Sequence, residues 1–301
     1  MNENHKTQVG GQAVIEGVMM RSPEYVSVAV RKPDDKILVK RESYISWTKR
    51  NKLLGLPFIR GGVVLIESMV LGIKALNFSG DIAMQEESGP KHSKNNKLML
   101  ALTVIIALIL GIGLFFYLPL ILTELTGVVN NTLFNLIDGV IRLIFLLTYI
   151  FLISRWKEIK RIFEYHGAEH LSIFIYENKK PMKFSSAEEY TTHHPRCGTS
   201  FLFMVMIVAV LVFILLGKPE TITDRIIRLL FVPVIGGISY EIIRLSGKKF
   251  GTKLAKIITA PGLWLQNLTT ERPDEKQLEV AFTALKSSLD MELDPGVEVI
   301  E

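Results

Sequence analysis

Long apolar runs constrain this chain more than any other feature of its sequence. Residues 97–122 contain no acidic side chain and only one basic one, at the first position. A helix over this range rises about 1.5 Å per residue and crosses a hydrocarbon layer about 30 Å thick. Residues 133–153 form a second run, residues 201–216 a shorter third and residues 226–243 a fourth. We therefore predict four transmembrane helices in a mainly α-helical polytopic membrane protein.

Basic residues flank these runs and indicate the orientation. They lie before the first run, after the second and after the fourth, whereas the connection at residues 123–132 has none. The positive-inside rule places the basic flanks, and with them both termini, in the cytosol. Contact with anionic lipid headgroups explains the net charge of +5, so the lipid bilayer is the expected partner and nucleic acid is not.

Shorter patterns predict the remaining segments. Residues 25–42 alternate in polarity around a Pro-Asp-Asp turn, which indicates a cytosolic β-hairpin. Residues 59–76 are apolar but contain Glu67 and Lys74, so a packed or re-entrant helix is favoured over a fifth span. Residues 155–165 have the pattern of an interfacial helix, and residues 272–289 that of a cytosolic amphipathic helix.

These expectations divide the chain into seven segments. In order they are the cytosolic N-terminal region with the hairpin (1–58), the packed or re-entrant helix (59–80), a polar linker (81–96), the first two spans (97–153), a cytosolic interfacial segment (154–200), the last two spans (201–243) and the cytosolic C-terminal region (244–301).

One short motif points to chemistry. His166, Glu169 and His170 match H-x-x-E-H, in which two imidazoles one helical turn apart can chelate a single divalent metal. In the inverzincin arrangement the glutamate is the general base, and a second, downstream glutamate completes the ligands. Glu241 is the candidate for that role.

A second cluster precedes the third span and offers two further ligands, His194 and Cys197. Cys197 is the sole cysteine, so an intramolecular disulfide is excluded and a metal ligand, a buried thiol or a reactive group remain. A shell of both motif histidines, His194 and Cys197 is closed and structural. With Glu241 in place of Cys197, or with three protein ligands, one position stays open for water. Nitrogen and sulfur donors favour zinc.

The roles of four other charged residues each allow two interpretations. Arg196 is a candidate catalytic residue that could stabilise an oxyanion or bind a phosphate or carboxylate. Glu16 and Arg21 lie in a stretch of glycine and apolar residues, where they either pair to fix a loop or line the metal site. For Glu67 the same two interpretations apply, a structural ion pair or a place in the lining of the metal site.

Several sequence blocks together resemble the YqhQ-like family of bacterial membrane proteins. The blocks are GGQAVIEGVMMRSP, YHGAEH, HPRCGTSF, PVIGGISYEIIRL and APGLWLQNLTT. The resemblance implies a bacterial inner-membrane protein and a metal-dependent enzyme without an assigned substrate. Carried over residue by residue, it points to Glu16, Arg21, His166, Glu169, His170, His194, Arg196, Cys197 and Glu241.

Two functions are favoured by these observations, ahead of a cysteine-histidine nucleophile as a third interpretation and a transporter as a fourth. The first is a metal-dependent hydrolase at the cytosolic membrane surface, acting on peptide bonds or lipid headgroup esters. The second is a non-catalytic scaffold or accessory subunit of another membrane complex, such as insertion or export machinery, in which the metal is structural.

Overall fold

The hairpin expected at residues 25–42 is present in the computed structural model of the chain, which describes residues 9–83, 95–248 and 252–300. It consists of β3 (Tyr25–Arg31) and β4 (Ile37–Ser43), which pair antiparallel. The sheet is larger than predicted, because β1 (Gly10–Val14), β2 (Gly17–Arg21) and the C-terminal β5 (Glu298–Ile300) extend it in the order β1-β2-β3-β4-β5. Only β5 runs parallel to its neighbour.

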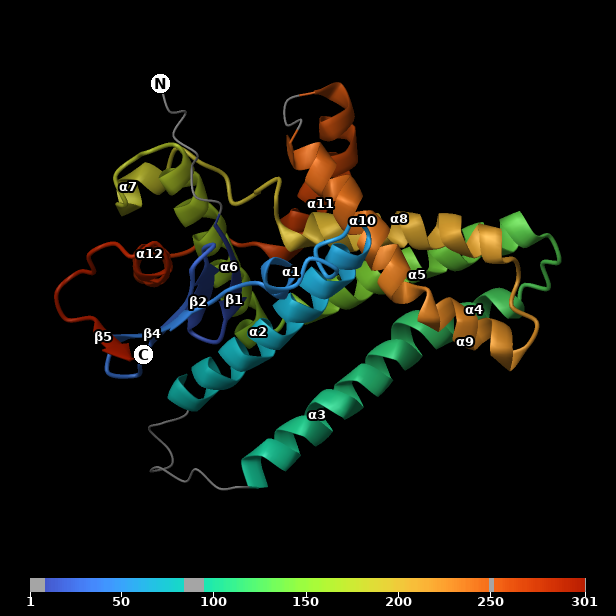
Figure 1. The fold of residues 1–301 in the computed structure, drawn as a ribbon, viewed down its shortest axis with the longest axis horizontal. Helices are drawn as coiled ribbons and strands as arrows, with labels where there is room; N and C mark the ends of the chain where they lie inside the picture. The colour runs from blue at the N-terminus through green and yellow to red at the C-terminus, as the bar shows by residue number, and fades with distance from the viewer. Residues whose placement is uncertain (1–8, 84–94, 249–251, 301) are drawn as a thin grey trace.

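Helices cover both faces of this sheet (Figure 1). Side chains of successive strand residues point to opposite faces. One face, with Val14 and Val28, packs against α2 (Ile59–Ala83). The other, with Val18 and Met20, packs against α6 (Lys157–Glu177) and α12 (Glu275–Ser288). The predicted C-terminal amphipathic helix is α12, which begins with a capping box between Asp274 and Gln277.

Within the described residues, four helices are long and apolar enough to cross a membrane, and the structure is compatible with a multi-pass membrane protein. The first combines α3 (Asn95–Ile112), the π-helical turn η1 (Gly113–Tyr117) and α4 (Leu118–Glu124). The others are α5 (Asn131–Ile153), α8 (Gly198–Leu216), and α9 (Ile222–Leu230) followed by α10 (Val232–Lys248). All four overlap the predicted runs.

A charged pair inside the second apolar helix stabilises the first. Asp138 accepts a hydrogen bond from Arg142 at 2.8 Å within α5. The same guanidinium donates to the carbonyls of Phe115 and Phe116 at 2.9 and 3.1 Å. A π-helical turn disturbs the regular backbone pattern, and Arg142 supplies donors to its carbonyls.

The helix α2 is packed, as expected for residues 59–76, and is not one of the four apolar helices. Its first turns lie against α10, where an added side-chain carbon at Gly61 would be 2.8 Å from the Gly237 backbone. Its later turns cover the sheet. The expected linker at residues 81–96 lies mostly outside the described residues.

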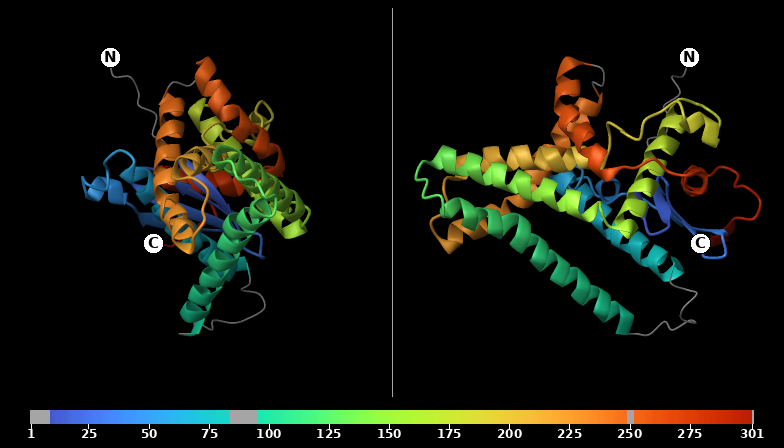
Figure 2. Two further views of the ribbon diagram at one scale, coloured as in Figure 1. Left: turned by 90° about the vertical axis from the view of Figure 1, so that its right-hand side faces the viewer. Right: turned by 180° about the vertical axis from the view of Figure 1, so that it is seen from behind.

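The chain turns sharply between α5 and α6, at residues 154–156, so that α6 runs steeply across the direction of α5 (Figure 2). The helix predicted at 155–165 is therefore only the first half of α6. The helix α11 (Lys253–Thr269) also runs across the direction of α8 (Figure 1). Two one-turn helices, α1 (Trp47–Arg50) and α7 (Phe184–Ala187), complete the described elements.

Candidate metal centre

The H-x-x-E-H motif lies in the middle of α6, on the part of the helix that packs against the sheet and α12. Its neighbours Tyr165, Ala168 and Leu171 belong to the buried core. The rings of His166 and His170 are 4.4 Å apart between centroids, as expected for positions one turn apart. The helix therefore presents both imidazoles side by side.

Each of these imidazoles is oriented by a backbone carbonyl. Nδ1 of His166 donates to the Thr269 carbonyl at 2.8 Å, and Nδ1 of His170 donates to the Thr192 carbonyl. A carbonyl oxygen accepts and cannot donate, so Nδ1 carries a proton, and in the neutral imidazole Nε2 then carries the lone pair. Metal-ligating histidines are commonly held in this way.

A glycine in the motif permits one of these contacts. An added side-chain carbon at Gly167 would collide with the Glu271 carbonyl oxygen. The connection between α11 and α12 lies against α6 at this point, where Glu271 N–H donates to the Phe163 carbonyl at 3.0 Å. This close approach brings the Thr269 carbonyl to His166.

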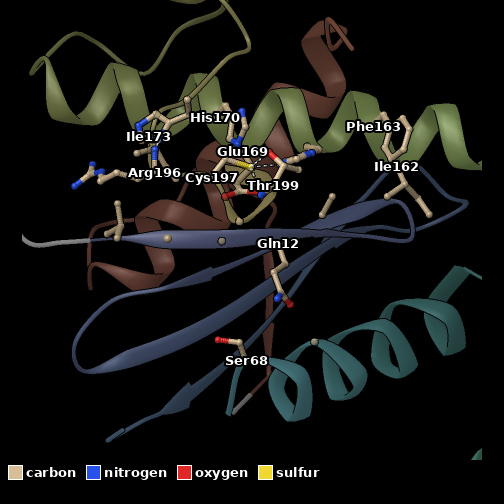
Figure 3. A pocket seen from close by; sticks show the side chains of 18 of the residues that line it. Gln12, Ser68, Ile162, Phe163, Glu169, His170, Ile173, Arg196, Cys197 and Thr199 are labelled. Carbon is tan, nitrogen blue, oxygen red and sulfur yellow. Dashed lines mark hydrogen bonds between the residues drawn. The ribbon is translucent and has the colours of Figure 1, made fainter. Parts of the chain in front are cut away.

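Cys197 supplies the third donor atom. It is the N-cap of α8, and its Sγ lies 3.2 Å from His166 Nε2. The amide and hydroxyl of Thr199 donate to the same sulfur at 3.5 and 3.4 Å. Figure 3 shows Cys197 and Thr199 beside Glu169 and His170.

The three donors are close enough to bind one ion. Ligand atoms of His166, His170 and Cys197 all lie within 4.8 Å of one another. His170 Nε2 is buried and makes no hydrogen bond of acceptable geometry to any described residue. A buried acceptor without a donor is costly, and a cation at this position removes the cost. Two nitrogens and one sulfur suit zinc and leave a fourth tetrahedral position.

Glu169 lies next to the three donors and is almost fully buried, with 6% of its surface exposed. Burial raises the pKa of its carboxyl above the ordinary value, whereas the neighbouring imidazoles of His166 and His194 and a backbone hydrogen bond from Gly11 lower it. The net shift is upward. This is the direction in which a carboxyl is tuned for proton transfer near neutral pH.

His194 flanks the three donors without joining them. Its Nδ1 accepts from the Arg196 amide at 3.3 Å, and the side chain of Gln266 bonds both its amide and its carbonyl. Burial lowers the pKa of His194 to about 4, so its 3.8 Å contact with Glu177 is not an ion pair at neutral pH. The structure thus gathers His166, His170 and Cys197, but not His194, around a common point.

Glu241, the predicted downstream ligand, lies outside the cluster of His166, His170 and Cys197. Its two carboxylate oxygens accept from Nε and Nη2 of Arg60 at 2.6 and 2.5 Å. This bidentate pair joins α10 to the start of α2. A carboxylate engaged in this way has both oxygens occupied.

The remaining predicted residues hold elements together. Glu16 has a left-handed backbone in the turn between β1 and β2 and pairs with Arg161 of α6. Arg21 pairs at 3.1 Å with Glu67, which is 1% exposed. Arg196 pairs with Glu177 at the end of α6, and it also borders the cavity described below.

A cavity of about 610 Å³ opens beside the cluster. It is bounded by β1, α2, α6 and residues 194–199, and the histidines, Glu169 and Cys197 all line it (Figure 3). Sequence reasoning missed Gly11 and the carbonyls of Thr192 and Thr269. No side-chain pattern identifies a backbone carbonyl, although the glycine pair before Gln12 is a signal of close approach.

Comparisons with known proteins agree with the resemblance noted from the sequence. Residues 56–291 match the family described as "Protein of unknown function (DUF1385)". The chain is 34% identical over 294 residues to "Uncharacterized protein YqhQ" of Bacillus subtilis (strain 168), covering 94% of this chain and 92% of that protein. No solved structure matches the chain. The chain therefore belongs to the DUF1385, or YqhQ-like, family.

Proposed function

We propose that this protein is a metal-dependent hydrolase at the cytosolic surface of the bacterial inner membrane, with zinc held by His166, His170 and Cys197. The main support is the convergence of three donor atoms within 4.8 Å, with Nδ1 of both imidazoles bonded to a backbone carbonyl, which leaves Nε2 as the ligand atom. Three protein ligands leave room for water or substrate, which is typical of catalytic zinc.

The expected surface location follows from the helix that carries Cys197. This residue caps α8, which is apolar along its length, so the cluster lies where a predicted span begins. Basic residues after α5, including Arg155 and Lys157, favour the cytosolic side. Both termini are then cytosolic.

Glu169 is the proposed general base and acid. A zinc ion held by His166, His170 and Cys197 would polarise the substrate carbonyl and lower the pKa of water. Glu169 takes one proton from the attacking water, whose oxygen bonds to the carbonyl carbon. The bond from that carbon to the leaving nitrogen or oxygen breaks, and Glu169 returns the proton to the leaving atom. Arg196, which borders the cavity and pairs with Glu177, is the proposed contact for a negative group of the substrate.

The alternative is a scaffold or an accessory subunit of a membrane complex with a structural metal. One observation favours it: the cluster connects α6, the end of α11 and the start of α8, which are distant in sequence. An ion at their junction would stabilise the association of the sheet with the apolar helices.

Metal analysis of the purified full chain tests the shared premise. We expect about one zinc ion per chain, and loss of that ion when His166→Ala and His170→Ala are combined. Glu241→Gln is the matched control, because Glu241 lies outside the cluster, and it should retain the metal. Unchanged zinc in the double variant would reject the site and leave the 3.2 Å contact of His166 with Cys197 as a candidate catalytic dyad.

A further inference from the structure

Strand β1 is an edge of the sheet beside the candidate metal centre. Among the described strands its only neighbour is β2. Val14 and Gly17 are partners across a two-residue turn, so they form a hydrogen-bonded pair. Pairing alternates along an antiparallel ladder, so Gly11 and Ala13 direct their N–H and C=O groups away from β2. These backbone groups can pair with another extended chain.

The 610 Å³ cavity runs along this free edge. Figure 3 shows β1 between α6, which carries Glu169 and His170, and α2, which carries Ser68. Ile162 and Phe163 line the α6 side, and Met69 and Leu76 line the α2 side. The five residues of β1 extend about 16 Å, enough for a substrate segment of about four residues. Alternate side chains of that segment would contact the two apolar walls.

A second cavity, of about 520 Å³, continues from the first beyond Gly10. The two share the residues from Val9 to Gln12. Arg21 and Lys49 line the second cavity together with several hydroxyl groups, and none of the described residues lining it is acidic. The Arg21 guanidinium already pairs with Glu67 at 3.1 Å, so Lys49 is the cation that makes this part of the groove complementary to a negatively charged group.

We propose that the substrate is an extended polypeptide that adds as a strand to the free edge of β1. Apolar side chains of this polypeptide contact α6 and α2, and a carboxylate enters the second cavity. This inference rests on the proposed hydrolase function and assigns its substrate class. Strand addition uses main-chain hydrogen bonds for affinity and side-chain pockets for specificity.

The contact between Gly11 and Glu169 connects binding to the chemistry. The Gly11 amide now donates to the Glu169 carboxylate. A substrate carbonyl pairing at this position takes over that hydrogen bond, which frees Glu169 to accept a proton from water. Hydrolysis then breaks a peptide C–N bond, forms a C–O bond and leaves the water protons on the new amine and carboxyl groups.

A lipid ester is the competing substrate, because the walls are apolar. An acyl chain fills apolar space but has no partner for the outward carbonyl group of Gly11 or for the outward amide and carbonyl groups of Ala13. Burying those groups beneath a lipid without partners is unfavourable. The edge therefore favours a polypeptide.

Three zinc-binding probes distinguish these substrates on the zinc-loaded full chain in detergent. They are succinyl-Leu-Leu-Leu-hydroxamate, its backbone N-methylated form and an alkyl hydroxamate of equal length. We expect the peptide to bind about tenfold tighter than the N-methylated form, the effect of about two lost hydrogen bonds. It should also slow amide hydrogen exchange in a fragment covering residues 10–16. An acetyl cap in place of succinyl should weaken binding.

Edge variants provide a second measure. Ala13→Pro removes an outward N–H without breaking the ladder to β2, whereas Ala13→Ser keeps it. We expect only the proline variant to weaken peptide binding, with alkyl binding unchanged. If Ala13→Pro does not fold, Gly10→Val is the second variant. A side-chain carbon added at Gly10 meets nothing within 4 Å, so the fold should accept it, and Gly10 lines both cavities, so the larger side chain should narrow the groove.

The outcomes separate this inference from the function on which it rests. Equal or tighter binding of the alkyl probe, with no effect of N-methylation, overturns the polypeptide assignment and indicates an acyl substrate. If zinc is present and no hydroxamate binds, the coordination shell is closed. Both the hydrolase function and this inference are then rejected in favour of the scaffold.

Discussion

His166 Nε2 and Cys197 Sγ lie 3.2 Å apart, although 31 positions separate these residues in the sequence. The contact joins the middle of α6 to the N-cap of α8. It therefore couples the sheet-packed part of the molecule to an apolar helix. Changes to either residue should affect metal content and the association of these two parts together.

The roles of Glu169 and Cys197 separate an enzyme from a scaffold. In a hydrolase, Glu169→Gln should retain zinc and thermal stability, because the amide oxygen of glutamine can still accept a hydrogen bond from Gly11. The same variant should lower the hydrolysis rate about 10²–10⁴-fold and should not complement a deletion strain. Cys197→Ala should lose zinc in either case. Full complementation by Glu169→Gln at normal expression would reject the hydrolase and favour the scaffold.

The glycine between the motif residues should be required for the site. Gly167→Ala brings a methyl group against the Glu271 carbonyl, so we expect a loss of about 1–3 kcal/mol in stability and weaker zinc binding. Gly111→Ala in α3 is the control, because it meets nothing within 4 Å and alanine favours helix. Melting temperatures in detergent measure the stability of both variants. Equal stability of the two variants would contradict the close approach at α6.

His194 should make stability depend on pH. Its folded pKa of about 4 lies below the ordinary 6.5, so the unfolded chain binds a proton first as pH falls. Stability is then retained above about pH 6.5 and decreases by about 2 kcal/mol between pH 7 and pH 5. Denaturant unfolding of His194→Gln should show a smaller decrease, and His193→Gln should resemble the unchanged chain. A decrease identical in all three would exclude His194 as the source.

Topology can be tested by cysteine labelling of intact cells, starting from a Cys197→Ala background. Single cysteines at Glu177 and Lys276 should be protected from an impermeant reagent, and those at Gly127 and Glu220 should react. We expect this pattern because the basic residues that flank the apolar helices favour the cytosolic side of the membrane. An accessible Glu177 would contradict both the orientation and a cytosolic site, because Glu177 pairs with Arg196 beside the cavity.

The sequence by itself determined the apolar helices, the hairpin, the C-terminal helix and the proximity of His166 to His170. Each depends on periodicity or on spacing within a single element, which short-range geometry fixes. The first four residues of β1 gave no such signal, because a glycine-rich edge strand shows little alternation of polar and apolar side chains. Its position became visible only once β2 paired with it.

Only the tertiary structure decided which distant residues meet. Glu241 and His194 were as suitable as Cys197 by residue type, but Arg60 engages the first and Gln266 holds the backbone of the second. Cys197 reaches the histidines because α8 begins beside α6, and the imidazoles face it because backbone carbonyls of Thr192 and Thr269 orient them. Contacts of this kind depend on how elements pack, and side-chain identity along the chain does not encode them locally.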